Sequence, residues 1–338
     1  MIKVAMIGFG GIAGAHRYAY WYYQRAGLPV RLVAAADVDP SKFTAITKIN
    51  IALRGEIVDE LPFNTYTDWR EMLEKEQPDL VDICLPTAFH KAVAIEAMER
   101  GFHVMCEKPM ADTYEDCCEM VQVAEKTGRQ LMIAQCVRFQ PEYEYLQQAV
   151  VDGRYGKVLA ATFGRYSPFP TWNSTWRIHA GRSGGCLPEL NIHDIDVIQA
   201  IFGQPQTVSC DLQSKVYPYD FADTVFSYPE LDVHIKSAWY DKDYLFNACY
   251  EVEFENGVLS HERGEVRFTD RDGTVCPITV EDADGVMGEI RYMVNMLESG
   301  AENHRNPPTA SAETIYALEK LYESADAGGK SLLYREML

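Results

Sequence analysis

The chain has 338 residues, and its 31 basic and 50 acidic side chains give a formal net charge of −19 at pH 7. This length predicts about two domains, and the negative charge argues against a nucleic-acid partner or an anionic membrane surface, since both require basic contacts. The nine cysteines lack the spacing of metal-binding motifs. No apolar run is long enough to cross a bilayer. We therefore expect a reduced, cytoplasmic protein.

The first part of the chain alternates between β-branched apolar runs and helical patterns. The expected strands cover residues 2–8, 30–37, 80–86, 103–109 and 130–137. Such alternation is typical of a parallel sheet with helices on both faces. We therefore expect a doubly wound Rossmann domain over residues 1–137.

Helix signals fit this expectation. Asp68 and Glu71 form a capping pair before one helical pattern, and Thr113 precedes another. Gly101 and Gly128 are placed as helix stops.

A glycine-rich turn follows the first expected strand. In "GFGGIA", Gly8, Gly10 and Ala13 form a G-x-G-x-x-A pattern where the strand meets a helix. The glycines allow a tight turn and the approach of a pyrophosphate to the helix N-terminus. We expect the whole loop to bind a dinucleotide, and Phe9, Gly11 and Ile12 complete it. The alternative is a purely structural glycine turn.

An acidic residue ends the second expected strand. Asp37 lies where a carboxylate accepts hydrogen bonds from both hydroxyls of an adenosine ribose and repels a 2′-phosphate. This favours NAD over NADP, although Arg31 or Lys42 could soften the preference.

A lysine follows the strand at 103–109. In "CEKPM", Lys108 lies at the sheet edge where cofactors bind. A lysine there can hydrogen-bond a substrate hydroxyl or exchange a proton if burial lowers its pKa. The alternative is a surface lysine in a turn fixed by Pro109.

The remainder of the chain has a different pattern. Helices are expected at 141–151, 185–202, 287–299 and 310–327, and strands at 158–167, 224–228, 232–240 and in a hairpin over 250–262 that turns at Asn256-Gly257. Strands that follow one another without helices indicate a mostly antiparallel sheet. We expect an α+β domain over residues 138–338.

The helix expected at 185–202 carries a carboxylate and a histidine. Glu189 and His193 are four residues apart, on one face of an α-helix. A carboxylate one turn away can orient the imidazole, so His193 is a candidate general base or acid. The same face offers too few ligands for a metal. We therefore predict no metal site, and structural roles for Asp194 and Asp196.

Taken together, these motifs resemble the glucose-fructose oxidoreductase, inositol dehydrogenase and rhizopine catabolism (Gfo/Idh/MocA) family. The likeness runs through "GFGGIA", "AADVDP", "VDICLPTAFH", "CEKPMA", "RFQP", "WRIHAGRSGGC" and "HDID" to the C-terminal "SAETIYALEKLYESADAGG". The resemblance implies an N-terminal Rossmann domain, an open C-terminal sheet that packs against other subunits in a dimer or tetramer, and NAD(P)-dependent oxidation or reduction of a sugar or polyol hydroxyl.

The resemblance also assigns roles to residues. Lys108 matches the family's catalytic lysine, whose following proline is often cis, and His193 matches its catalytic histidine. The positions that commonly line the dinucleotide correspond to Asp37, Thr87, His90, Glu107, Lys108 and Gln135. One departure is Glu189, where familiar dehydrogenases of the family have aspartate.

The expected reaction is hydride transfer between a secondary alcohol carbon and the nicotinamide. His193 takes the hydroxyl proton, Glu189 orients it, and Lys108 holds the same oxygen. Residues expected to contact the substrate are Arg138, Trp172, Trp176, Arg177 and His193, although the aromatic residues fit a core or subunit interface equally well. Two alternatives remain: NAD-dependent glycoside elimination or hydrolysis through transient oxidation, and a non-enzymatic dinucleotide sensor.

Overall fold

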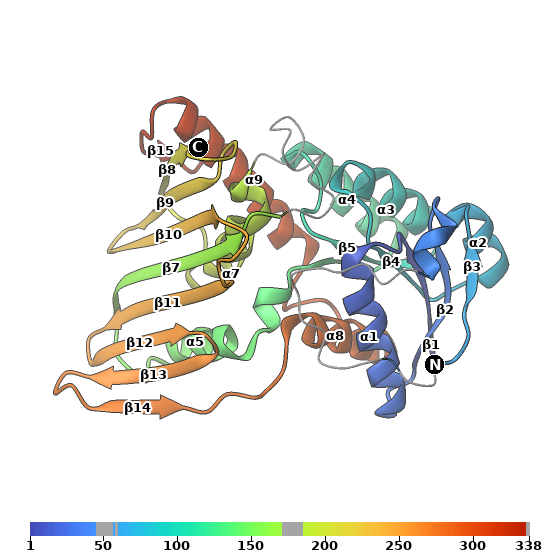
Figure 1. Ribbon diagram of the computed structural model, residues 1–338, viewed down its shortest axis with the longest axis horizontal. Helices are drawn as coiled ribbons and strands as arrows, with labels where there is room; N and C mark the ends of the chain where they lie inside the picture. Colours follow the sequence, from blue (N-terminus) through green and yellow to red (C-terminus); the bar gives the residue numbers. More distant parts are fainter. Residues whose placement is uncertain (45–56, 58–59, 171–184, 336–338) are drawn as a thin grey trace. The chain divides into compact units, whose positions relative to one another are not determined.

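The computed structural model describes residues 1–44, 57, 60–170 and 185–335. The chain divides into two compact units, shown in Figure 1. Unit 1 comprises Met1–Cys136 and Asp284–Ala312, and unit 2 comprises Val137–Ala283 and Glu313–Leu338. The first boundary lies next to the one expected from sequence, but the segment Asp284–Ala312, expected in the second domain, groups with unit 1.

A six-stranded sheet in the order β3-β2-β1-β4-β5-β6 forms the centre of unit 1. All its strand pairs are parallel. The strands are β1 (Ile2–Ile7), β2 (Val30–Ala36), β3 (Asn64–Tyr66), β4 (Leu80–Ile83), β5 (His103–Glu107) and β6 (Leu131–Ala134). The doubly wound prediction is confirmed, and the short β3 is the strand that the sequence did not predict.

Helices flank this sheet, with α3 and α4 above it and α1 and α8 below it in Figure 1. Their bounds are α1 (Gly11–Arg25), α2 (Trp69–Glu76), α3 (His90–Glu99), α4 (Tyr114–Thr127) and α8 (Gly285–Ser299), with short 3-10 turns η1 (Pro40–Phe43) and η2 (Thr87–Phe89). Asp68 caps α2 by accepting the N–H of Arg70, and Thr113 caps α4 by accepting the N–H of Asp116. Glu71 instead pairs with Lys75.

Helix α8 belongs to unit 1 because its apolar face completes the core below the sheet. Ile290, Met293 and Val294 are fully buried in one cluster with residues of α1, β1 and β6. Burial of apolar area is the main favourable term in folding, so this late segment joins the parallel sheet rather than the strands that precede it.

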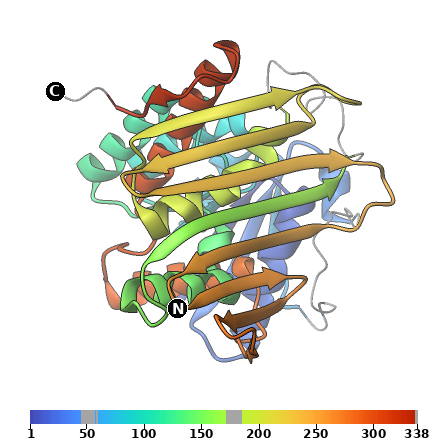
Figure 2. The ribbon, with the colours of Figure 1, turned by 90° about the vertical axis from the view of Figure 1, so that its left-hand side faces the viewer.

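Unit 2 is built on a nine-stranded sheet in the order β14-β13-β12-β11-β7-β10-β9-β8-β15. The pairs are antiparallel except for β7 with β10. The strands are β7 (Val158–Pro168), β8 (Thr207–Gln213), β9 (Phe221–Tyr228), β10 (Leu231–Tyr240), β11 (Asn247–Phe254), β12 (Gly257–Glu262), β13 (Glu265–Asp270), β14 (Val275–Ile278) and β15 (Leu332–Leu333). Figure 2 turns the open face of this sheet toward the viewer.

The predicted hairpin is present, but its turn lies one residue earlier than expected. Phe254 pairs with Gly257, which leaves Glu255 and Asn256 as the turn residues. A Cβ at residue 257 would lie 2.2 Å from the carbonyl oxygen of Thr269, so glycine is needed there for the close approach of the next strand.

The helices of unit 2 pack on one side of its sheet. They are α5 (Pro141–Asp152), α7 (Ile192–Phe202) and α9 (Pro308–Asp326), whose first turn belongs to unit 1, together with the 3-10 turn η3 (Cys136–Phe139) at the boundary. The prediction of one continuous α-helix over 185–202 needs correction. Leu187–Asn191 forms a π-helical turn, η4, before α7 begins.

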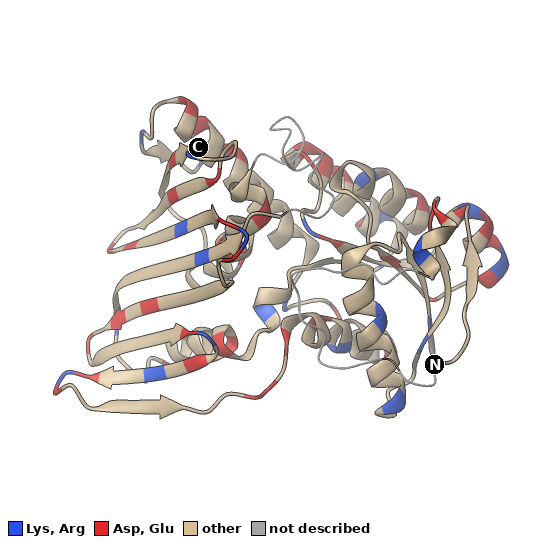
Figure 3. Ribbon diagram, viewed as in Figure 1, with Lys and Arg blue, Asp and Glu red and all other residues tan. Residues whose placement is uncertain are grey.

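Charged residues lie on the helices of both units and also along the strands of the nine-stranded sheet, as Figure 3 shows. Among the described residues, no helix combines the length and apolar character needed to cross a membrane.

Candidate active site

The glycine-rich turn between β1 and α1 has the geometry expected of a dinucleotide loop. Gly8 has a φ of +89°, and a Cβ there would lie 2.5 Å from the carbonyl oxygen of Cys84. A Cβ at Gly10 would meet nothing within 4 Å, so open space lies beside the start of α1. Gly11 and Ile12 begin the helix partly exposed, whereas Ala13 is buried. The helix N-terminus is thus accessible to an anionic group.

The side chain of Phe9 points away from this open space. Its ring is buried against Phe43 and Phe63, at centroid distances of 5.2 and 5.8 Å. Its backbone N–H donates to Oδ2 of Asp37 at 2.8 Å. Phe9 therefore offers its backbone to the loop, and its ring fastens the loop to the core.

Asp37 lies directly after β2, beside the same loop. Its Oδ1 accepts the N–H of Asp39 at 2.9 Å, and its Oδ2 also lies 3.2 Å from the ammonium group of Lys42. Oδ2 already accepts from Phe9 and Lys42, so Oδ1 is the oxygen that keeps a lone pair for a ribose hydroxyl. The Lys42 contact shows that a cation neighbours the carboxylate, as the sequence analysis allowed.

The loops after β4 and β5 carry the next group of predicted residues. Thr87, at the start of η2, is partly exposed. His90 is buried below these loops, with Nδ1 2.8 Å from the carbonyl oxygen of Pro109 and Nε2 2.7 Å from that of Leu85. Burial lowers its pKa, whereas the contacts with the two carbonyl oxygens act in the opposite direction. His90 thus ties the two loops together from beneath.

Lys108 follows β5 at the carboxyl edge of the parallel sheet. Its side chain is partly exposed, and the Lys108-Pro109 peptide bond is cis, as the resemblance implied. Its backbone N–H donates to Oε2 of Glu107 at 3.0 Å. Glu107 itself is buried, with 8% of its surface exposed.

Gln135 is a buried polar residue at the same edge of the sheet. It follows β6 and is 1% exposed, yet neither Oε1 nor Nε2 of its amide has a hydrogen-bond partner among the described residues. An unpartnered buried amide is costly unless a ligand completes it. The open glycine loop, Asp37 and Gln135 fit a dinucleotide laid along the carboxyl ends of the strands.

Three buried titratable residues of unit 1 escaped the sequence analysis. His16 on α1, Asp82 on β4 and Glu289 on α8 each have no exposed surface. A carboxylate on the apolar face of an expected helix was the available signal for Glu289. The ligand atoms of His16, Asp82 and Cys84 all lie within 4.8 Å of one another, which makes these residues the one metal-type cluster found among the described residues.

In unit 2, the π-helical turn η4 and the helix α7 carry the predicted proton-transfer pair. Glu189 lies in η4 and is buried, and His193 lies in the first turn of α7 and is partly exposed. A π turn pairs residues five apart, rather than four, in its backbone hydrogen bonds. The expectation that Glu189 and His193 share one helix face assumed a continuous α-helix, so it does not apply directly here. Asn191 anchors this turn by donating to Oγ of Ser237 at 3.1 Å.

Two buried ion pairs fix α7 on either side of His193. Arg165 of β7 contacts Asp194 at 2.8 and 3.0 Å, and Arg138 of η3 contacts Asp196 at 2.6 and 2.8 Å. Thr314 also donates to Asp196, at 2.9 Å. Both aspartates are therefore structural, as expected.

The predicted substrate residues are only partly visible. Arg138, one of them, is 7% exposed and has two of its nitrogens bound to Asp196. Trp172, Trp176 and Arg177 lie outside the described residues.

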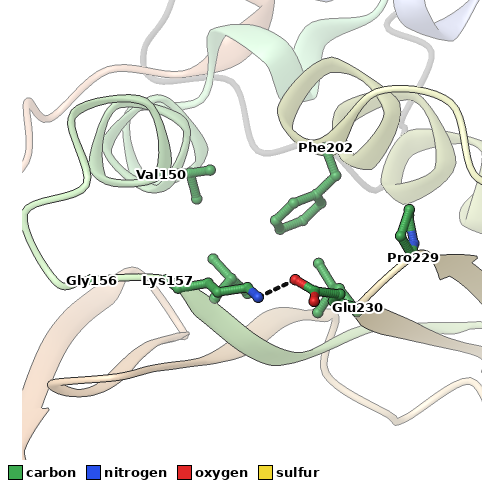
Figure 4. A pocket seen from close by; sticks show the side chains of 8 residues that line it. Val150, Gly156, Lys157, Phe202, Pro229 and Glu230 are labelled. Carbon is green, nitrogen blue, oxygen red and sulfur yellow. Dashed lines mark hydrogen bonds and ion pairs between the residues drawn. The ribbon is translucent and has the colours of Figure 1, made fainter.

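A hollow in unit 2 lies apart from His193. Val150, Phe202 and the Lys157–Glu230 ion pair are among the residues that line it (Figure 4). Phe202 ends α7, whereas His193 is near its start, which places them about 13 Å apart along the helix axis. The hollow is therefore separate from the predicted proton-transfer residues.

Comparison with known proteins agrees with this description. Residues 2–135 match the model of the "Oxidoreductase family, NAD-binding Rossmann fold", and residues 143–260 match that of the "GFO/IDH/MocA C-terminal domain". Unit 1 therefore contains an NAD-binding Rossmann fold.

Two curated relatives show the range of the similarity. D-glucoside 3-dehydrogenase of Escherichia coli is 31% identical over 215 residues, which cover 63% of this chain and 57% of that protein. The scyllo-inositol 2-dehydrogenase (NADP(+)) of Bacillus subtilis is 26% identical over 303 residues, which cover 86% of this chain and 91% of that protein. For the first, the match spans little more than half of the relative's length.

Among solved structures, a levoglucosan dehydrogenase in complex with NADH and levoglucosan has a TM-score of 0.84. It is 18% identical, and the match covers 99% of this chain and 100% of that chain. At this identity the likeness establishes the fold.

Proposed function

The chain belongs to the Gfo/Idh/MocA oxidoreductase family, and from this we propose that it is an NAD-dependent dehydrogenase that oxidises a secondary hydroxyl of a sugar or polyol. The observation that carries the proposal is the set of cofactor-type groups at one edge of the parallel sheet: an open glycine loop, the Asp37 carboxylate and the unpartnered Gln135 amide. The printed names of the relatives, which are glucoside, inositol and levoglucosan dehydrogenases, support a carbohydrate substrate.

Each residue of the proposed site has a defined task. The N–H groups at the start of α1 bind the pyrophosphate, Asp37 accepts the ribose hydroxyls, and the Gln135 amide completes the polar lining. NAD, when bound, supplies the hydride acceptor. His193 takes the proton from the substrate hydroxyl, and Lys108 hydrogen-bonds the same oxygen and stabilises its developing negative charge.

Glu189 is proposed to orient His193 from the π turn. We propose that this buried carboxylate reaches the imidazole, where it favours the tautomer that presents a ring nitrogen to the substrate and stabilises the imidazolium formed by proton transfer. The ion pairs at Asp194 and Asp196 hold the helix backbone that carries His193.

The test measures NADH absorbance with NAD and a panel of inositols, free sugars, glycosides and sugar acids. We expect reduction of NAD with one substrate class. His193→Ala and Lys108→Met should each lower kcat by about a hundredfold or more, while the NAD dissociation constant measured by calorimetry stays within about threefold of wild type. A lost NAD affinity or an unchanged kcat contradicts the assigned roles, and glycoside consumption without NADH contradicts net oxidation.

We further propose that the chain forms a homo-oligomer through the open face of the nine-stranded sheet. That face is exposed in a single chain, since alternate residues of β10 are exposed, among them Asp232, His234 and Lys236. Light scattering coupled to gel filtration should give a mass of at least twice 38.3 kDa, and a monomer mass would contradict this.

A further inference from the structure

The buried cluster in unit 1 has a histidine between two carboxylates. Nδ1 of His16 lies 2.9 Å from Oδ2 of Asp82, and Nε2 lies 3.1 Å from Oε1 of Glu107. The hydroxyl of Tyr20 donates to Oδ2 of Asp82 at 2.9 Å. These four side chains come from α1, β4 and β5, and His16 is fully buried.

This geometry determines the charge of the imidazole. A neutral ring has one N–H, but here both ring nitrogens face an acceptor, so both nitrogens must carry a proton if both carboxylates are ionised. Burial is the largest single effect on the pKa of His16 and lowers it, but the charge of Asp82, the interaction with Cys84 and the hydrogen bonds together outweigh burial, and the net pKa lies well above 6.5. The cluster thus contains an imidazolium between two carboxylates.

Glu289 of α8 completes the cluster in a different state. Neither of its carboxyl oxygens has a hydrogen-bond partner among the described residues, and the side chain is fully buried. Burial, with further contributions from Glu107, Asp82 and Asp284, raises its pKa well above 4.5, against the opposing effect of His16. The buried and unpartnered Glu289 carboxyl therefore favours its neutral form, and His16 is the cation that faces Asp82 and Glu107.

The cluster contacts the proposed active site through one side chain. Oε1 of Glu107 faces His16, and its Oε2 accepts the backbone N–H of Lys108 at 3.0 Å. A charge-assisted hydrogen bond is stronger than a neutral one. The position of Lys108 after β5 therefore depends on Glu107 remaining ionised, although Glu107 is buried.

We propose that His16 is a positioning residue: as a buried imidazolium it keeps Glu107 ionised, and Glu107 in turn holds the backbone of Lys108 in the orientation that the reaction uses. This inference rests on the proposed function for the role of Lys108. The charge state of the cluster and its contact with the Lys108 backbone do not depend on that function.

The geometry favours this role over a metal site at His16, Asp82 and Cys84. A metal on Nδ1 would have to displace the proton that joins it to Asp82 at 2.9 Å. Burial also raises the pKa of the Cys84 thiol to about 12, so it stays protonated at neutral pH rather than becoming a thiolate ligand.

Substitution of His16 should make Glu107 titrate. In His16→Gln the cation is lost, so the buried Glu107 carboxylate faces Asp82 without compensation and takes up a proton more readily than in wild type. Because the general base His193 must be deprotonated, kcat already falls at low pH, and in His16→Gln we expect a further loss of about tenfold at pH 6 relative to pH 9. The double variant His16→Gln/Glu107→Gln lacks the carboxylate at residue 107 and should not show this further loss. The matched control Glu289→Gln changes a carboxyl that is already neutral and should keep the wild-type profile.

A readout that does not use activity separates this inference from the proposed function. With 15N-lysine labelling, the Lys108 amide signal should be constant between pH 6 and 9 in wild type and should titrate in His16→Gln. With 15N-histidine labelling, both ring nitrogens of His16 should carry protons at pH 8. If both NMR results are obtained but no substrate yields NADH, the proposed function is refuted. The inferred charge state of His16, and its effect on Glu107 and Lys108, is then still supported.

Other results would overturn the inference itself. A neutral His16 ring at pH 8, a Lys108 amide that does not titrate in folded His16→Gln, or a further low-pH loss of kcat that persists in the double variant would each do so. Retention of one zinc ion per chain through dialysis against EDTA, with loss of the Nδ1 proton, would also overturn it in favour of a metal site. If His16→Gln fails to fold, the wild-type ring signals still decide the charge state.

Discussion

Asp37 combines two contacts that have opposite effects on cofactor choice. Its carboxylate suits ribose hydroxyls, but Lys42 lies 3.2 Å away and would attract a 2′-phosphate. We predict that Asp37→Ser shifts the ratio of kcat/KM for NAD over NADP toward NADP by about tenfold or more, because the repulsion is removed and the lysine remains.

Steady-state kinetics with both cofactors check this prediction, and Asp37→Ser/Lys42→Ala serves as the control, which should lose the gain with NADP. An unchanged ratio in Asp37→Ser would show that the carboxylate does not face the ribose.

Site residues differed in how well they could be predicted. Gly8, Asp37 and Lys108 could be proposed as site residues because each occupies a fixed position after a strand of a recurrent fold. His16 and Glu289 were not, because their chemistry depends on burial against partners from distant segments: His16 meets Asp82 and Glu107, and α8 brings Glu289 to them from the other end of the chain.

At the scale of elements, helix α4 depends on a cap that was visible in the sequence. The Oγ1 of Thr113 accepts the N–H of Asp116 at 3.2 Å. We predict that Thr113→Ala lowers the free energy of unfolding by about 1 kcal/mol, a fall in Tm of roughly 2–4 °C for a unit of this size. Thermal unfolding followed by circular dichroism measures this, with Thr113→Ser as the control that keeps the hydroxyl. Equal losses in both variants would contradict the capping role.

Long apolar patterns predicted most elements, whereas short or irregular ones escaped. β1, β2 and β4 lie within the ranges expected from their β-branched runs. β3 has only three residues, "NTY", and forms by pairing with β2 rather than by its own hydrophobicity. The π turn η4 was not predicted because the apolar positions of 187–192 fit an α-helix as well, and the local sequence alone does not reveal one extra residue in a turn.

At the scale of the whole molecule, the neutral state of Glu289 makes stability depend on pH. Its folded pKa is raised above 4.5, so its contribution is complete below about pH 4.5 and is lost as the pH rises toward the folded pKa. Glu289→Gln cannot lose a proton. We predict that its free energy of unfolding, relative to wild type, increases between pH 5 and 8, by at most about 1.4 kcal/mol per pH unit. Urea unfolding across this range measures it, and a constant difference would show an ionised Glu289.

The net charge of −19 predicts that added salt stabilises the folded protein. Salt has the opposite effect on a protein stabilised by surface ion pairs. Like charges over the surface repel one another in the folded state. Raising NaCl from about 10 to about 150 mM shortens the screening length from roughly 30 to 8 Å. We therefore expect Tm to rise in a calorimetric scan, and a fall would mean that the surface ion pairs outweigh the repulsion.

The two-segment construction of unit 1 has a consequence for synthesis on the ribosome. The parallel sheet is translated first, but α8, which buries the apolar face of α1, is translated only after the strands of unit 2. A nascent chain that has emerged only as far as β14 therefore exposes that apolar face. Glu289 lies on α8 and has not yet emerged to pack near His16. Dinucleotide binding should therefore protect nascent chains from protease only after α8 has left the exit tunnel.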